Sequence, residues 1–178
     1  MIAIHRALAA LGRKQDATER MLQWLKQHPR DAAARIYLAS ALMSAQDYAG
    51  AAAQYEKIIE ADAGNVVALN DLAWSLQQVK DKRALAFAER AYKLAASNPA
   101  VNDTLGWVLM EQGQHERALP LLKLASEAAP NASEIRFHYA TALMKTGDKP
   151  AARRQLERLL ADKSFARHGE VRALMPLL

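Results

Sequence analysis

Five histidines are the side chains of this sequence best suited to hold a metal ion or to exchange protons near neutral pH. They are His5, His28, His115, His138 and His168. No two of them are four residues apart, and none belongs to an HExxH motif. That spacing is what places two imidazoles on one helix face around zinc. The sequence therefore gives no support for a metal site.

Motifs for nucleophilic or phosphate chemistry are absent as well. The chain has no cysteine, which excludes disulfides, thiolate zinc ligands and a thiol nucleophile. It has no G-x-S-x-G motif and no glycine-rich loop that leads into lysine and serine. We interpret Asp71 and Asp103 as residues that cap, bond to other side chains or meet a ligand, rather than as a catalytic pair. We expect no enzyme activity and no cofactor.

Two of the three tryptophans occur in similar sequence contexts. Their side chains are suited to binding another protein. The segment NDLAW ends at Trp74, and NDTLGW ends at Trp107. Tryptophan is enriched among the few residues that dominate the energy of protein interfaces. How these rings are used depends on the elements that position them.

A repeat of 33 or 34 residues explains the similarity. A leucine or tyrosine followed by a small residue recurs at positions 38–39, 72–73, 105–106 and 139–140, and an alanine recurs at positions 17, 51, 84, 118 and 152. Two markers that keep one period over five units indicate a repeat protein. We predict one continuous domain with these segments: units at 1–31, 32–65, 66–98, 99–132 and 133–166, and a final segment at 167–178.

Each unit is predicted to form two helices. Alanine and leucine dominate the composition, which favours helix, and apolar residues follow the helical period on both sides of a polar turn. Gly12, Gly113 and Gly147 stand where a first helix must end and can adopt the left-handed cap conformation. Pro29 and Pro130 follow second helices. The predicted fold is an all-α, right-handed solenoid of helix-turn-helix units.

The final segment breaks the repeat and is expected to cap it. A helix from about residue 167 to residue 175 would place Val171 and Leu174 on Leu156 and Leu159. A solenoid needs such a cap, because its last unit otherwise leaves an apolar face in water.

One side of the first helices is predicted to form a partner-binding groove. Trp74 lies about 200° from Leu72 on a helical wheel, on the side that faces away from the core. Aromatic and methionine side chains on an exposed face are typical of a binding site. The predicted groove residues are Tyr37, Met43, Asn70, Asp71, Trp74, Gln77, Asp103, Trp107, Met110, Phe137, His138 and Met144. The alternative is that they pack between neighbouring units. Trp24, on a second helix, is expected to be core or exposed at the end.

The repeat resembles the tetratricopeptide repeat family, whose units of 34 residues are helix-turn-helix pairs. Unit four carries the family pattern as Leu105, Gly106, Leu109, Ala118, Leu122, Ala125 and Pro130. The tryptophan often found early in the first helix is replaced by Arg35, Leu69, Asn102 and Arg136. The resemblance implies a non-catalytic scaffold that binds a protein or peptide. Some members grip a C-terminal carboxylate with cationic residues, which the corresponding positions here lack.

The sequence of residues 65 to 165 is also similar to the C-terminal repeats of bacterial exosortase/PEP-CTERM-associated repeat lipoproteins. That resemblance implies an exported, lipid-anchored parent, in the periplasm or at the outer membrane, with a role in exopolysaccharide or protein-sorting machinery. Without it, a cytoplasmic location is the alternative. The chain itself shows no signal peptide and no membrane-spanning run. Its first unit is clipped, so we expect it to begin inside a longer array.

Two other functions remain as alternatives. The exposed apolar end of the clipped first unit could support self-assembly into a homo-oligomer. The net charge is +5, and residues 145–172 contain eight basic and four acidic residues, which is the feature that suggests nucleic acid or an acidic surface. Because no aromatic residues alternate with the arginines of that unit, we consider nucleic-acid binding unlikely.

Overall fold

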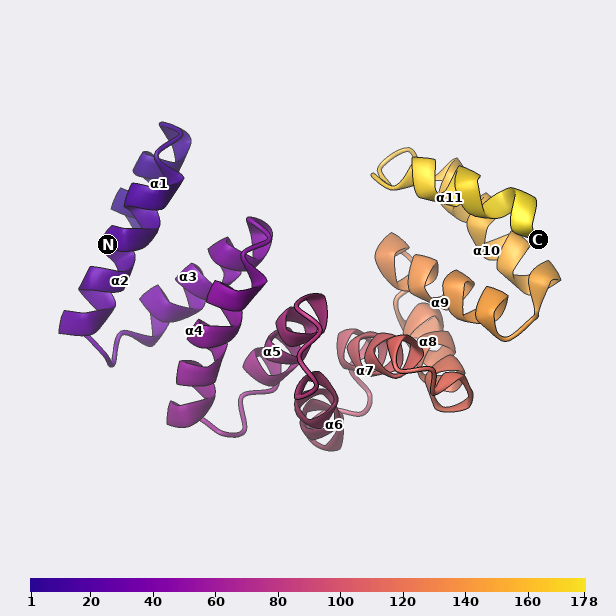
Figure 1. Cartoon of the computed structure of the whole chain (residues 1–178), viewed down its shortest axis with the longest axis horizontal. Coiled ribbons are helices and arrows are strands. Elements are labelled where there is room, and N and C mark those ends of the chain that lie inside the picture. Colours follow the sequence, from indigo (N-terminus) through magenta and orange to yellow (C-terminus); the bar gives the residue numbers. More distant parts are fainter. The chain divides into compact units, whose positions relative to one another are not determined.

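The computed structural model describes all 178 residues and contains only helices (Figure 1). Eleven α-helices are followed by a short 3-10 helix, η1. The α-helices are α1 (Ile2–Ala10), α2 (Lys14–Gln27), α3 (Ala32–Ser44), α4 (Tyr48–Ala61), α5 (Val66–Gln78), α6 (Ala84–Leu94), α7 (Pro99–Glu111), α8 (His115–Ala128), α9 (Ser133–Lys145), α10 (Lys149–Ala161) and α11 (His168–Leu174), and η1 is Met175–Leu177.

The chain divides into two compact units, Met1–Ala84 and Leu85–Leu178, and each is described by itself. In the first unit α1 packs against α2, and α4 packs against both α3 and α5. In the second unit α7 packs against both α8 and α9, and α10 packs against α9 and α11. Consecutive helices joined by short turns form hairpins in both units (Figure 1). The predicted all-α fold of helical hairpins is confirmed, whereas the boundaries of the five repeats stay a prediction.

The turns inside the hairpins share one backbone conformation. The three predicted cap glycines have φ angles of +78°, +75° and +89° at Gly12, Gly113 and Gly147. Gln46 and Lys80 adopt the same left-handed conformation, at +62° and +58°. In all five turns the next residue donates its N–H to the carbonyl of a leucine in the preceding helix: Leu8, Leu42, Leu76, Leu109 and Leu143. This six-to-one bond is the Schellman motif, which satisfies carbonyls left over at a helix end.

Five helices, α3, α4, α5, α7 and α10, are capped at their start by a side chain. The carboxylate of Asp31 accepts the N–H of Ala34 at 3.0 Å, and that of Asp148 accepts the N–H of Ala151 at the same distance. Asp47 and Asn65 cap their helices in the same way, and Asn98 accepts the N–H of Ala100, two residues on. Each cap satisfies a backbone donor that has no partner inside the helix, and contributes about 1 kcal/mol.

The positions where the family's tryptophan is replaced have a structural role of their own. At three of them a polar side chain donates to the carbonyl of the residue six positions earlier, in the loop before the helix. The bonded pairs are Arg35–Pro29, Asn102–Ala96 and Arg136–Pro130. These three residues therefore bond α3, α7 and α9 to the loops that precede them.

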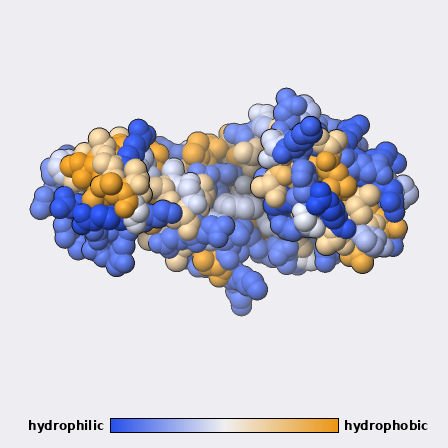
Figure 2. Space-filling view, turned by 90° about the horizontal axis from the view of Figure 1, so that it is seen from above, coloured by the Kyte–Doolittle hydropathy of each residue, from blue (hydrophilic) through white to orange (hydrophobic).

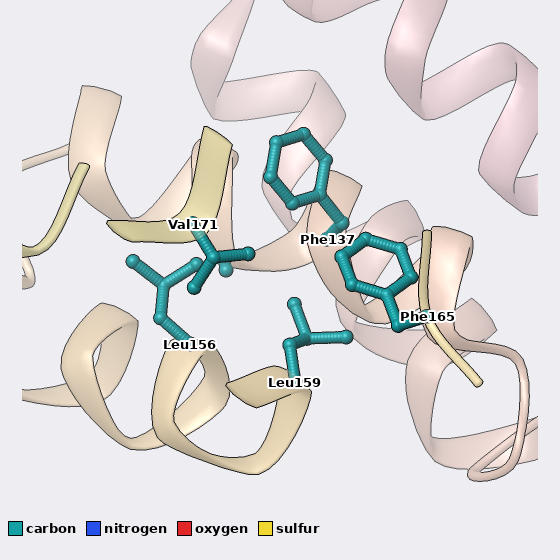
Figure 3. Close-up of a cluster of buried hydrophobic side chains, with 6 residues drawn as sticks. Phe137, Leu156, Leu159, Phe165 and Val171 are labelled. Carbon is teal, nitrogen blue, oxygen red and sulfur yellow. The ribbon is translucent and has the colours of Figure 1, made fainter. Parts of the chain in front are cut away.

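The C-terminal helix caps the second unit as predicted (Figure 3). Val171 is fully buried against Leu156 and Leu159. Phe165, in the loop before α11, completes this cluster together with Phe137 from α9. Phe165 was not identified from the sequence, and Phe137 was expected in the groove. That expectation was wrong, because α11 and its loop cover the side of α9 that carries this ring.

The hairpin of α7 and α8 leaves no room for a side chain at Gly106. A Cβ atom there would lie 2.7 Å from Cγ of Leu122, which is fully buried. We predict that Gly106→Ala destabilises the second unit by about 1–3 kcal/mol, because overpacking forces buried groups to shift. Urea denaturation followed by circular dichroism measures this. Gly169→Ala, in α11 where no atom lies within 4 Å, is the matched control. Equal effects of the two substitutions would contradict the close approach.

Lys80 adopts a backbone conformation that suits glycine. We predict that Lys80→Gly stabilises the first unit by about 0.5 to 1 kcal/mol, because it removes the steric cost of a left-handed residue with a side chain. Gly113→Ala reverses the change at the equivalent turn and should destabilise the chain by a similar amount. Thermal denaturation of both variants checks this, and a loss of stability in Lys80→Gly would count against it.

Candidate partner-binding surface

The predicted groove residues of the first unit lie on α3 and α5. Tyr37 and Met43 come from α3, and Asn70, Asp71, Trp74 and Gln77 come from α5. All six are half-buried, so none is a core residue and none extends freely into solvent. Each side chain is therefore partly accessible at the surface while it remains packed against its neighbours.

Tyr37 is held by α1. Its hydroxyl lies 3.0 Å from Nδ1 of His5, and the two rings meet edge to face with centroids 5.1 Å apart. The guanidinium of Arg6 lies 5.4 Å from the centre of the Tyr37 ring. A cavity of about 290 Å³ opens beside this pair, lined by α1, α2 and α3 residues that include Lys14 and Ala41.

Asp71 lies in a polar cluster with side chains of α4 and α5. The side-chain amide of Asn70 donates to its carboxylate at 3.3 Å. The buried Tyr55 hydroxyl lies near the carboxylate, but no hydrogen bond of standard geometry holds it, and the side-chain oxygen of Asn70 has no partner either. Burial raises the pKa of Asp71, and the Asn70 amide and the nearby Tyr55 hydroxyl offset part of this effect. Burial and the Asp71 charge also raise the pKa of Tyr55.

Four of the six predicted groove residues in the second unit are buried, which corrects the prediction. They are Asp103, Met110, Phe137 and His138. Only Trp107 and Met144 are half-buried. The helical wheel assigned one buried face to each first helix, but α7 contacts both α8 and α9. The contact with the next first helix buries side chains that a single helix would leave in solvent.

Trp107 rests on a buried histidine–aspartate pair. Nδ1 of His138 lies 2.9 Å from both carboxylate oxygens of Asp103, which joins α9 to α7. The indole of Trp107 stacks on the His138 ring, with centroids 4.2 Å apart and planes 26° from parallel. Because the carboxylate fixes the imidazole, it also fixes the surface on which the indole lies. No such role was assigned to His138 or Asp103 from the sequence, since their contact spans two repeats.

Trp24 has a different role from the one expected. It is half-buried, and its indole N–H donates to the carboxylate of Asp31 at 2.8 Å while its ring stacks on His28 at 3.6 Å. The bond from Trp24 therefore supports the residue that caps α3.

The basic residues near the C-terminus are partly occupied by contacts within the second unit. Lys149 and Arg153 donate to the carbonyls of Leu177 and Leu178. Arg167 bonds to Glu134 and Glu170. These contacts hold the C-terminal end against α10 and α9, so part of the positive charge has a structural role.

Hydrophobic residues reach the surface in separate patches on the face that Figure 2 displays, with hydrophilic residues between them. No group of three or more histidine, aspartate or glutamate side chains is arranged to hold a metal ion. None of the helices is both long and apolar enough to cross a bilayer.

The raised pKa of Asp71 predicts a pH-dependent effect of Asp71→Asn. A carboxyl group with a raised pKa in the folded state stabilises the fold when protonated, and this contribution is lost as the pH rises through the folded-state pKa. Asparagine resembles the protonated form. We therefore expect the variant to have a higher urea midpoint than the wild type at pH 7, and the gap to narrow toward pH 4. Glu60→Gln, on exposed Glu60, controls for the lost charge. A gap that widens toward low pH would contradict the burial of Asp71.

Two tetratricopeptide repeat families match the sequence, one at residues 3–66 and one at residues 109–175. Among solved structures, the thermophilic TPR protein TTC0263 of Thermus thermophilus has a TM-score of 0.74 at 20% identity, covering 99% of this chain and 97% of that chain. YrrB, described as a TPR protein with an unusual peptide-binding site, has a TM-score of 0.61 at 27% identity, covering 82% and 76%. MamA from Desulfovibrio magneticus RS-1 has a TM-score of 0.73 at 17% identity, covering 91% and 94%.

A search of the curated proteins found no match. The two sequence matches together cover well over half of the chain, and the helical hairpins have the turns and the small buried residues that the repeat requires. The chain is therefore a tetratricopeptide repeat protein.

Proposed function

We propose that this protein is a non-catalytic scaffold that binds a peptide segment of a partner protein through the first-helix face of its repeats. The observation that carries the proposal is the arrangement of Trp107, half-buried on the His138–Asp103 pair. Trp74 occupies the equivalent position one repeat earlier and is also half-buried. In this proposal the two indoles are the anchors, and Tyr37, Met43, Gln77 and Met144 contribute the surrounding contacts.

A fixed indole is a better anchor than a mobile one. Binding has to offset the entropy lost when interface side chains are immobilised. Trp107 is already stacked on His138, whose orientation the Asp103 carboxylate holds, so little of that entropy is left to lose. Central tryptophans of this kind contribute about 2 kcal/mol or more at protein interfaces.

The relatives support the same class of function. Tetratricopeptide repeat proteins are generally scaffolds without catalytic activity. YrrB, the relative described as having an unusual peptide-binding site, makes a peptide the favoured ligand class here as well. The absence of cationic side chains at the carboxylate-gripping positions favours a ligand other than a C-terminal carboxylate.

The proposal extends to the setting of the parent protein. The sequence of residues 65 to 165 supports a place in bacterial envelope machinery for exopolysaccharide export or protein sorting, with a lipid-anchored parent. Self-assembly is the competing function, and the exposed Ile4 and Leu11 near the start of the chain favour it. The proteins that the chain captures test both the envelope setting and self-assembly.

A pull-down from the source organism with three forms of the chain tests the proposal: wild type, Trp74→Ala/Trp107→Ala, and Lys57→Ala/Lys123→Ala as a control on exposed second-helix residues. We expect the captured partner to be lost with the tryptophan variant alone, and its peptide to bind that variant at least about tenfold more weakly. Circular dichroism must show that the variant keeps its helices.

Two results would contradict the proposal. Partners that bind the tryptophan variant as strongly as the wild type would move the function to another surface. Capture of the chain itself as the only partner, with sedimentation that depends on concentration, would favour self-assembly.

A further inference from the structure

Two aspartates of the predicted groove have opposite surroundings. Asp103 is buried, and His138 lies 2.9 Å from its carboxylate. Asp71 is half-buried, and no lysine, arginine or histidine side chain is bonded to it. The neutral amide of Asn70 donates to it at 3.3 Å. Partial burial of a carboxylate without a counter-charge costs solvation free energy. A cation beside the carboxylate would offset that cost.

The groups around Asp71 are neutral, and two buried oxygens among them lack a hydrogen bond of standard geometry. The Tyr55 hydroxyl is buried, with its residue only 2% exposed, and lies near the Ser40 hydroxyl and the Asp71 carboxylate without a hydrogen bond of standard geometry. The side-chain oxygen of Asn70 is also buried without a partner. Together with the carboxylate, these oxygens form a polar cluster on α4 and α5 that lacks a cation. Buried polar atoms of folded proteins normally have partners, so a cluster that lacks them requires an explanation.

Trp74 lies one turn after Asp71 on α5. Residues three apart are neighbours on a helix surface. The stem of a lysine or arginine that reaches the carboxylate therefore passes close to Trp74. This arrangement suits a cationic side chain better than a free metal ion, because the cluster holds only one carboxylate.

We propose that Asp71, with Tyr55 and Asn70 behind it and Trp74 beside it, is a subsite for an ammonium or guanidinium group of the bound partner. The inference rests on the proposed function and names the chemistry that the partner must bring. A lysine or arginine side chain is the occupant, and the N-terminal amine of a peptide is the second source of the same chemistry. The partner's cation supplies the counter-charge that the first unit itself does not supply.

Asp71→Asn removes the charge that the partner's cation would neutralise. The variant also makes a clean test, because it keeps the shape of the side chain and is expected to fold at least as well as the wild type.

Selection of random heptapeptides on the immobilised chain tests the proposal. We expect the enriched peptides to share a lysine or arginine next to an aromatic or aliphatic residue. Synthetic copies are then made in three forms: unmodified, with the basic residue replaced by acetyl-lysine, and with the N-terminus acetylated. Binding of each is measured by calorimetry to the wild type, Asp71→Asn and the control Glu60→Gln.

The expected result is at least about tenfold weaker binding when either Asp71 or the positive charge is removed, with no further loss when both are removed. If N-terminal acetylation weakens binding and lysine acetylation does not, the subsite binds the terminal amine of the peptide. Enriched peptides that lack a basic residue, or that bind Asp71→Asn unchanged, would overturn the inference and leave peptide binding intact. Selection of no peptide would overturn the proposed function as well.

Discussion

The distance between the two helices of a hairpin is the constraint on which the rest of this structure depends. Ala39, Gly106 and Ala140 on first helices face a partner helix that also carries a small residue, and those residues are Ala51, Ala118 and Ala152. All six are buried, and each of the alanines is fully buried. This close approach lets the larger apolar side chains, such as Leu122, fill the core from both helices. It also leaves the opposite side of the first helices for contact with the next repeat or with a partner.

The turns and the ends of the fold could be predicted because they depend on local chemistry. Glycine at a helix end, proline after a helix and a constant period are read directly from the chain, and they indicated the hairpins and the C-terminal cap. Gln46 and Lys80 were not identified as left-handed residues, because neither residue type indicates that conformation. The turns around them nevertheless have the same geometry, since the six-to-one bond to Leu42 and Leu76 requires it.

The candidate surface was harder to predict, and the reason is contact between repeats. A helical wheel describes one helix in isolation, and it correctly separated the buried Leu72 from the half-buried Trp74. It could not show that α9 lies on α7 and buries Asp103 and His138. Nor could it show that Asp103 lies against a histidine side chain while Asp71 does not. The difference arises from residues one repeat away, where the sequence carries no local signal.

The helix α6 is shorter than its counterparts, with 11 residues against 14 in α4 and α8. The missing residue of the third repeat falls between Lys80 and Ala84, and the two compact units meet in sequence at Leu85. Stability in repeat proteins is roughly the sum of unit stabilities and nearest-neighbour contacts. Each substitution reports on the half of the chain in which it lies.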